Sequence, residues 1–412
     1  MNAALLLLAW VVPSTTWIVV GPDGPHTSVA AGIAAAAPHD TVWVQPGVYD
    51  EPTLVLDRPV TLVGAPGAVL DGRGERGLIV VRSDSVTVRG LTFRDTGISF
   101  TEDRAALLVD GARFCTLEGN RFFDTFFGIY LANAGDCRVV GNTLTASATR
   151  ETRAGNGIHL WYSKRVRVED NRISGHRDGI YFEFVEDSDV ERNDSAHNVR
   201  YGLHFMFSDG CRYRSNRFAA NGAGVAVMYT RDVLMVGNDF DRNRGMAAYG
   251  LLLKDIRDSR IEGNRFRDNS VGLYAEGVTR LTVEDNDFTG NGWAIQLMAN
   301  SEGSRFARNT FLANSFDVST NSRRTHSRFE GNYWDRYRGY DLDRDGAGDV
   351  PFHPVRLFAL LAEQTRPILL LHRSLLVLLL DVAEQILPVL TPANLVDERP
   401  LLTPPTSAWR MS

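Results

Sequence analysis

A fixed spacing of asparagines constrains this chain more than any other feature. Seven of the nine gaps between ten recurring asparagines are 22 or 23 residues. The other two gaps are 29 and 26 residues, as expected where a loop is inserted into one repeat. A fixed period with insertions is typical of a solenoid, in which each repeat packs only on its neighbours. The ten residues are Asn120, Asn142, Asn171, Asn193, Asn216, Asn238, Asn264, Asn286, Asn309 and Asn332.

Each repeat carries three short apolar segments separated by turn residues. The asparagine opens the pattern Asn-x-apolar-x-x-Asn, as in NRFRDN from residue 264 and NDFTGN from residue 286. An alternating strand precedes this pattern, and a Gly-apolar-x-apolar strand such as GIHL at 157–160 follows it. Alternation with a period of two indicates half-buried strands. We therefore predict an all-β chain, a right-handed, single-stranded parallel β-helix whose coils stack roughly 4.8 Å apart.

Stacking explains why these residue types recur. Asparagine tolerates the left-handed backbone of a tight bend, and in register each side-chain amide can hydrogen-bond to the next one. A phenylalanine follows two residues after each of five consecutive asparagines, from Asn216 to Asn309, and we expect these rings to form an internal aromatic column. The five are Phe218, Phe240, Phe266, Phe288 and Phe311.

The composition bounds the class of protein. With 412 residues, 44% of them hydrophobic, the chain can build a long core, and its net charge of −6 argues against a nucleic-acid-binding surface. Cys115, Cys137 and Cys211 each lie five residues before a ladder asparagine and so share one column. Cys115 and Cys137 would be within disulfide reach, but side chains stacked in register point the same way, so we favour free buried thiols.

The ends of the chain differ from its middle. We divide the chain into a leader-like segment with a first strand (1–27), the β-helix (28–350) and a Leu/Pro-rich helical and extended docking tail (351–412). Residues 3–12 resemble the apolar core of a signal peptide, but no Lys or Arg precedes them and no clear cleavage motif follows, so this leader is atypical. Residues 28–49 predict an Ala-rich helix and a strand that cap the open end of the β-helix.

An acidic stretch follows the last repeat. Asp341, Asp343, Asp345 and Asp349 match positions 1, 3, 5 and 9 of a calcium loop, but position 12 is Phe352 where a bidentate Glu belongs. The stretch predicts either a structural calcium site or a run of Asx-turns that closes the last coil.

The tail contains a Leu-rich helix between two prolines. Ser374 is placed to cap it, and the helix should run to about residue 387. Its apolar side chains cover most of its circumference, so it needs a partner: the last coil, a membrane surface or a membrane protein. A simple capping helix is the alternative. The candidate partner-binding residues are Leu375, Leu376, Leu379 and Leu380.

Side chains that alternate with the core positions should form two outward columns. One holds Tyr130, His159, Tyr181, His204 and Ala226, and the other holds Ala132, Trp161, Glu183, Met206 and Met228. Stacked methionine and tryptophan are unusual on a plain solvated face.

These columns suggest two kinds of site. Thioether and imidazole ligands suit Cu(I), so His204, Met206, Met228 and His159 are candidate copper contacts. The alternative is a protein contact surface that includes Trp161 and Tyr181. The two interpretations are compatible if the partner delivers the metal.

An enzyme is the competing class, because parallel β-helices also host polysaccharide lyases, hydrolases and epimerases. Such catalysis needs paired carboxylates, or a base with acidic metal ligands, on one exposed sheet. The best available set is Asp178, Glu183, Glu186 and His204, but no second carboxylate is placed opposite the first. We therefore keep a carbohydrate-active enzyme as the alternative.

Several strings resemble the NosD family of nitrous oxide reductase maturation proteins, over about residues 28 to 400. They are GNGIHLWYS (155–163), GHRDGIYFEFVEDS (175–188), RYGLHFMFSD (200–209), GAGVAVMYT (222–230), AYGLLLKDIRDS (248–259), NYWDRYRGYDLDRDGAGDVPFHPV (332–355) and RSLLVLLLDVAEQILPVLTP (373–392). The single repeat is common to many β-helix proteins, whereas these strings and the tail are specific.

The resemblance implies a periplasmic accessory protein rather than an enzyme. Members of the family are expected to act with an ABC-type transporter in assembling the copper–sulfide centre of nitrous oxide reductase, and the family is described as copper-binding. The implied partners are the membrane component of the transporter and the reductase, with a copper chaperone as a further candidate. The implied location is periplasmic, with membrane association through the partner.

Overall fold

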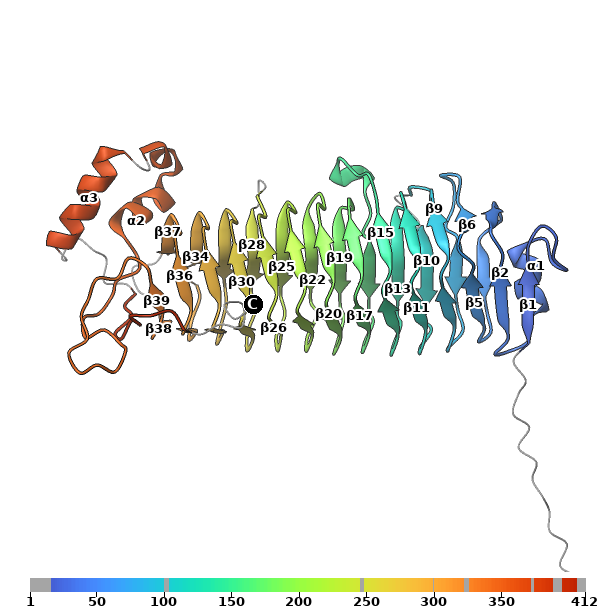
Figure 1. Cartoon of the computed structure of the whole chain (residues 1–412), viewed down its shortest axis with the longest axis horizontal. Coiled ribbons are helices and arrows are strands. Elements are labelled where there is room, and N and C mark those ends of the chain that lie inside the picture. The colour runs from blue at the N-terminus through green and yellow to red at the C-terminus, as the bar shows by residue number, and fades with distance from the viewer. Residues whose placement is uncertain are drawn as a thin grey trace, which may run out of the picture.

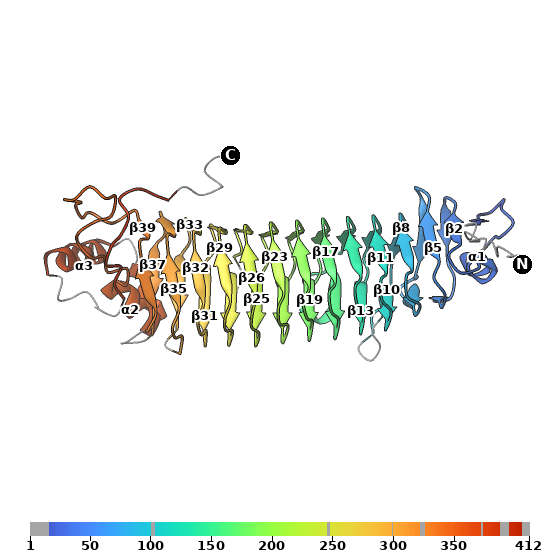
Figure 2. The ribbon, with the colours of Figure 1, turned by 90° about the horizontal axis from the view of Figure 1, so that it is seen from below.

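The computed structural model describes residues 16–99, 104–244, 248–298, 300–321, 326–371, 374–387 and 395–405. The leader-like residues 3–12 lie outside this part of the chain. Within it, the strands form three parallel sheets of 14, 12 and 13 strands. Two views a quarter turn apart show a straight rod (Figures 1 and 2). The expected parallel β-helix is confirmed.

From β2 onward, successive strands along the chain belong to different sheets, so one coil adds one strand to each sheet. Sheet 1 contains β1 (Trp17–Val20), β2 (Thr41–Val44), β5 (Thr61–Gly64), β8 (Thr87–Arg89), β11 (Thr116–Glu118), β14 (Arg138–Val140), β17 (Arg167–Glu169), β20 (Asp189–Glu191), β23 (Arg212–Arg214), β26 (Leu234–Val236), β29 (Arg260–Glu262), β32 (Thr282–Glu284), β35 (Arg305–Ala307) and β38 (Arg328–Glu330). Sheet 2 contains β4 (Leu54–Leu56), β7 (Ile79–Val81), β10 (Ala105–Asp110), β13 (Phe127–Ala132), β16 (Ile158–Trp161), β19 (Asp178–Glu183), β22 (Tyr201–Met206), β25 (Ala223–Met228), β28 (Tyr249–Lys254), β31 (Val271–Glu276), β34 (Trp293–Leu297) and β37 (Phe316–Ser319). Sheet 3 contains β3 (Gly47–Tyr49), β6 (Ala68–Asp71), β9 (Thr92–Arg94), β12 (Arg121–Phe123), β15 (Thr143–Thr145), β18 (Arg172–Ser174), β21 (Asp194–Ala196), β24 (Arg217–Ala219), β27 (Asp239–Asp241), β30 (Arg265–Arg267), β33 (Asp287–Thr289), β36 (Thr310–Leu312) and β39 (Tyr333–Trp334).

The asparagine ladder holds successive coils together. The backbone N–H of Asn216 donates to Oδ1 of Asn238 (3.0 Å), and its Nδ2 donates to the same oxygen and to the carbonyl of Val190. The same three contacts recur at every rung from Asn120 to Asn309. The buried backbone groups of the bend are therefore satisfied by side chains. A second ladder runs five residues further on, through Asn198, Asn221, Asn243, Asn269, Asn291 and Asn314.

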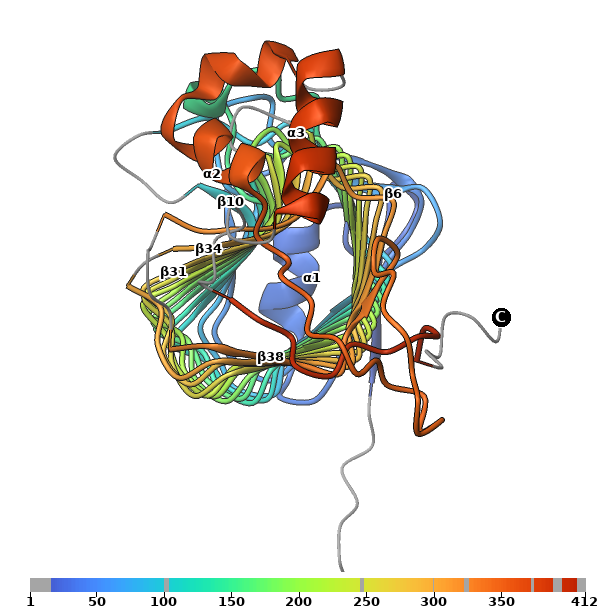
Figure 3. The same ribbon diagram turned by 90° about the vertical axis from the view of Figure 1, so that its left-hand side faces the viewer.

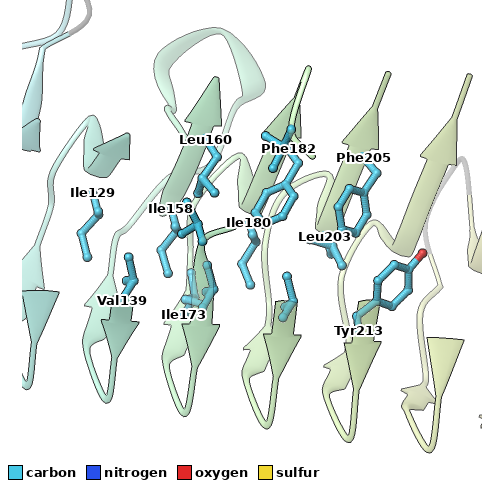
Figure 4. Packing of buried hydrophobic residues seen from close by; sticks show 14 of the residues in the cluster. Ile129, Val139, Ile158, Leu160, Ile173, Ile180, Phe182, Leu203, Phe205 and Tyr213 are labelled. Atoms are coloured by element: carbon cyan, nitrogen blue, oxygen red, sulfur yellow. The ribbon is translucent and has the colours of Figure 1, made fainter. Parts of the chain in front are cut away.

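Apolar side chains fill the interior in rows that run along the rod. Figure 4 shows one row, in which Ile158, Ile180 and Leu203 follow one another on consecutive coils. The predicted phenylalanine column is confirmed, because its neighbouring rings stack with centroids 4.6 to 5.7 Å apart. The column continues from Phe311 to Trp334 at 4.0 Å. All three cysteines are buried and free, as the sequence favoured.

A short helix closes the N-terminal end. α1 (Val29–Ala35) lies across the end of the space that the sheets enclose (Figure 3). Ser28 caps the helix by accepting from the N–H of Ala31, and the carboxylate of Glu51 accepts from the N–H groups of Val29 and Ala30. Gly32 permits close approach, since a Cβ there would lie 2.3 Å from a methyl group of Val20. The predicted cap is therefore present.

Helices cover part of the C-terminal end (Figures 1 and 3). α2 (Leu357–Gln364) packs on β37, and it is followed by η2 (Arg366–Leu371) and α3 (Leu375–Ile386). Ser374 caps α3 by accepting from the N–H of Val377. Among the described residues, every helix is too short or too polar to cross a membrane.

The chain then returns to the end of the β-helix. Asp397 is fully buried (0% exposed), and its Oδ2 accepts from the backbone N–H and Nδ2 of Asn332 and from Nε1 of Trp334, each at 3.0 Å. Its Oδ1 accepts from the N–H of Gly331 at 3.0 Å. Asp397 therefore takes the place of a further rung and ends the ladder.

Candidate functional site

The candidate copper contacts lie on the outer face of sheet 2. His159 on β16 pairs with Tyr181 on β19, which pairs with His204 on β22. In the second column Met206 on β22 pairs with Met228 on β25. Both columns have the register that the alternation predicted. These side chains point outward but are not fully exposed to solvent, because large neighbouring side chains in the two columns cover one another.

His204 is the most enclosed of the candidate ligands. His204 is 5% exposed, and its Nε2 atom is buried with no hydrogen-bond partner among the described residues. Nδ1 lies 3.4 Å from Nη2 of Arg200 and 4.0 Å from Oδ2 of Asp178. The rings of Tyr181 and Tyr201 flank it, with centroids 5.0 and 4.8 Å away. Desolvation lowers the pKa of His204 to about 4, so the imidazole is neutral at neutral pH.

The tautomer of His204 follows from its neighbours. A guanidinium only donates hydrogen bonds, so beside Arg200 the Nδ1 atom must be the acceptor and Nε2 carries the hydrogen. That hydrogen then points into a buried environment without an acceptor. Asp178 is fully buried and bound by Arg200 through Nε (2.9 Å) and Nη2 (2.6 Å). The position of Arg200 is therefore fixed by a bidentate ion pair.

The two methionines lie beside this group on the same face. Met206 is half-buried, and its sulfur accepts a hydrogen bond from the hydroxyl of Tyr181 at 3.7 Å. Met206 follows His204 by two residues on one strand, so their Cα atoms lie roughly 6.7 Å apart. Met228 is half-buried on the next coil. A neutral imidazole and two thioethers are thus placed on adjacent coils, and this donor set fits Cu(I).

His159 is not part of the same group. It lies two strands from His204, which places their Cα atoms roughly 10 Å apart, with the ring of Tyr181 between them. Nδ1 of His159 lies 3.2 Å from Nδ2 of Asn156, and desolvation with the charge of Arg177 lowers its pKa to about 3. A single metal ion held by Met206 and His204 would therefore not reach His159.

The candidate catalytic carboxylates are not brought together. Asp178 has both oxygens engaged by Arg200, and Glu183 is half-buried at the far end of the same strand. Glu186 lies past the corner that follows this strand, where it is exposed. The paired arrangement that a glycosidase-type mechanism needs is not formed by these three residues.

The acidic loop folds on itself. The carboxylates of Asp341, Asp343 and Asp345 have oxygens within 4.8 Å of one another. Asp341 accepts from the N–H groups of Arg344 (2.6 Å) and Gly346 (2.9 Å), and Asp345 is paired with the guanidinium of Arg399. Asp349 accepts from the N–H of Leu342 at 2.6 Å. These contacts match the Asx-turn alternative, and the bound guanidinium occupies a carboxylate that calcium would need. The calcium site stays a prediction.

The Leu-rich helix presents most of its predicted contact residues to solvent. Leu375, Leu376 and Leu379 are 71%, 62% and 59% exposed. Leu380 is instead half-buried, because it packs against the small cluster formed where α2 and β37 meet. Three of the four leucines are therefore accessible to a partner, and their role in partner binding stays a prediction.

Two features of this face were missed by the sequence. One is the pair Asp178 and Arg200 behind His204. The other is a row of exposed and half-buried aromatic rings at the corner after sheet 2, Tyr162, Phe184, Phe207 and Tyr229. Aligning the repeats would have revealed the row, since each ring directly follows the Trp161–Met228 column.

Taken together, the fold and the site are those of a parallel β-helix whose outer face carries histidine, methionine and aromatic side chains on adjacent coils. A family model described as periplasmic copper-binding protein (NosD) matches residues 143–339. A Pseudomonas aeruginosa protein described as a probable ABC transporter binding protein NosD is 31% identical over 420 residues, covering 97% of this chain and 96% of that protein. The chain therefore belongs to the NosD family of periplasmic copper-binding proteins.

Further comparisons agree on family and fold. A Stutzerimonas stutzeri protein with the same description is 28% identical over 387 residues, covering 88% of this chain and 87% of that protein. The Dettilon tailspike protein shares the fold with a TM-score of 0.58 at 14% identity, over 73% of this chain and 65% of that one. A family 28 exopolygalacturonase of Yersinia enterocolitica does so with a TM-score of 0.55 at 10% identity, over 79% of each chain. The relatives are thus described as binding proteins, while the fold itself also occurs in enzymes.

Proposed function

We propose that this protein assists the maturation of nitrous oxide reductase by holding Cu(I) transiently on the outer face of sheet 2. In this role it acts with an ABC-type transporter in assembling the copper–sulfide centre of the reductase. The observation that supports the copper site is the buried, unpartnered Nε2 of His204, on the same sheet face and the same or the adjacent coil as Met206 and Met228. The description of the family as copper-binding also supports a copper site.

The surroundings of His204 suit a neutral ligand. For Nε2 to bind a metal, the hydrogen has to move to Nδ1, which would then give up its contact with Arg200 and lies 4.0 Å from Oδ2 of Asp178. Asp178 would then orient the ring, as outer carboxylates do for many metal-bound histidines. Tyr181 would hold the sulfur of Met206 in place through its hydroxyl.

A Cu(I) titration against a chromophoric chelator, without oxygen, tests the site. We expect the double variant His204→Ala/Met206→Ala to bind Cu(I) more than about a hundredfold more weakly, because even losses outside the first coordination shell cost 10- to 100-fold. Gln296→Ala is the matched control, since Gln296 occupies the column of His204 four coils further on. Unchanged affinity in the double variant would refute this copper site.

The maturation role has its own test. The reductase is purified from a strain lacking this chain, and its copper content and visible spectrum are measured. We expect the catalytic copper–sulfide centre to be missing while the electron-transfer copper is retained. A fully loaded, active reductase would refute the role.

We further propose that the exposed leucines of α3 dock on the membrane component of the transporter. The proposal is supported by the exposure of Leu375, Leu376 and Leu379 on one short helix at the end of the rod. Leu376→Ser/Leu379→Ser should abolish co-purification with the transporter. Leu370→Ser is the control, because Leu370 is 90% exposed but lies outside α3. Equal co-purification of all three proteins would contradict docking through α3.

A further inference from the structure

Four aromatic rings, three of them exposed and one half-buried, form a row at the corner that follows sheet 2. We call Tyr162, Phe184, Phe207 and Tyr229 the ring ladder, because they occupy four consecutive coils. Neighbouring centroids lie 4.6, 5.1 and 5.1 Å apart, with interplanar angles of 22°, 9° and 15°. Tyr162, Phe207 and Tyr229 are 52%, 41% and 42% exposed. A continuous exposed apolar ridge of this kind marks an interaction site.

The backbone at this corner is unfavourable for aromatic side chains. All four residues of the ring ladder have left-handed backbones, with φ between 46° and 56°. The same corner carries Asn133, Asp255 and Gly277 on the flanking coils, which are residue types that tolerate this conformation. Asparagine is therefore compatible with the backbone at this corner, and the aromatic residues adopt the same backbone conformation at a cost in free energy. Strain of this type concentrates at functional sites.

The ring ladder is continuous with the candidate copper site. Met206 and Met228 directly precede Phe207 and Tyr229, and the ring of Trp161 packs edge-on against Tyr162 at 4.6 Å. A metal ion that passes directly between two proteins requires the two sites to abut. A protein that exchanges Cu(I) with these methionines therefore has to cover the ring ladder as well.

The stacking and the nearby charges indicate what kind of molecule fits. The faces of the inner rings are covered by their neighbours, so these rings offer their edges, whereas a sugar ring stacks on an aromatic face. Two residues after each ring stand Lys164, Glu186, Asp209 and Arg231, so both signs of charge are present in equal number. This arrangement does not favour a polyanion and suits a protein surface of mixed charge.

We propose that the ring ladder is the docking surface for the protein that accepts copper from this chain. The proposal rests on the proposed function, in which that acceptor is nitrous oxide reductase. The rings supply a flat apolar contact around Met206 and Met228, and the ion passes within the area that the contact shields from water. The exposed leucines of α3 lie at the C-terminal end of the rod, whereas the ring ladder lies on coils in its middle, so the two docking surfaces are separate.

The variant Phe184→Asn/Phe207→Asn tests this surface by keeping the backbone and removing the rings. Its binding to copper-free nitrous oxide reductase is measured by biolayer interferometry, together with its melting temperature and its Cu(I) affinity. We expect reductase binding about tenfold or more weaker, Cu(I) affinity unchanged, and a melting temperature equal to or above that of the wild type. The matched control is Phe114→Asn, because Phe114 is 55% exposed with φ 58° at another corner.

Each outcome is decisive. Unchanged reductase binding in the double variant would overturn the proposal, as would equal weakening by Phe114→Asn. A lower melting temperature would overturn the strain argument. Binding of an acidic polysaccharide such as alginate that depends on the rings, with reductase binding intact, would assign the surface to glycans instead. If the wild type binds no Cu(I) but the rings still govern reductase binding, the copper site fails and the docking surface stands.

Discussion

Replacing Asp397 by asparagine should loosen the C-terminal end of the β-helix. Five N–H groups converge on this buried carboxylate, three of them on Oδ2 and two, from Gly331 and Arg399, on Oδ1. An asparagine offers one acceptor oxygen, and its NH₂ group must then face at least one donor. With the oxygen at the Oδ2 position the contacts to Gly331 and Arg399 are lost, and with the opposite orientation three contacts are lost.

The cost follows from these contacts. A hydrogen bond to a charged acceptor contributes about 1.5–3 kcal/mol, and a buried donor left without a partner costs about as much. Relief of the buried charge offsets part of this loss. We therefore expect Asp397→Asn to weaken the end of the rod by about 2–4 kcal/mol, which corresponds to about 30- to 900-fold in a local opening equilibrium.

Hydrogen exchange read by mass spectrometry measures the effect locally. Repeats in a solenoid open from the ends, so amides in residues 331–334 should exchange faster by that factor, while amides near Asn171 keep their protection. Asp343→Asn is the control, because Asp343 is an exposed carboxylate in the same region. If exchange at 331–334 does not change, Asp397 does not hold the end of the ladder.

Three further predictions concern the middle of the rod. Asn238→Ala removes four side-chain hydrogen bonds within the ladder and should cost about 2–4 kcal/mol in chemical denaturation, whereas an unchanged midpoint would contradict the ladder as a source of stability. Burial lowers the pKa of His176 to about 4, so His176 does not reduce the free energy of unfolding above pH 6.5 but reduces it as the pH falls from 6.5 towards 4. In denaturation measured against pH, His176→Asn should reduce the slope of the free energy of unfolding in this range by about 1.4 kcal/mol per pH unit. An unaltered slope would exclude His176 as a cause. Asp178→Asn should weaken Cu(I) binding about tenfold in the chelator competition, and full affinity in a folded variant would show that Asp178 does not orient His204.

The coil structure could be predicted because its determinants are local and repeated. Each ladder asparagine hydrogen-bonds to the equivalent residue one coil away. The spacing of the repeat therefore determines which strands pair in all three sheets. The alternation of GIHL at 157–160 likewise fixed which side chains face inward, and the columns of His204 and Met206 followed from it.

The end of the ladder could not be predicted in the same way. Asp397 lies 65 residues from Asn332, beyond α2 and α3, and no repeat connects the two. Its contact depends on how the helices return the chain to the last coil. The enclosure of His204 was also missed, since alternation gives the direction of a side chain but not the size of its neighbours. Tyr181 and Tyr201 cover the imidazole from adjacent positions, so an outward residue became a buried one.

A rod explains how the two proposed docking surfaces act together. β37, on which α2 packs, lies four strands from β25, so Met228 is held roughly 19 Å from the end of the rod. Because the side chains of two asparagine ladders bond each coil to the next, this separation does not vary as it would across a flexible linker. A partner held at α3 and another on the ring ladder can therefore be bound at the same time without competing for one surface. A compact domain of equal mass would bring the two sites closer, whereas adding coils separates them without changing either one.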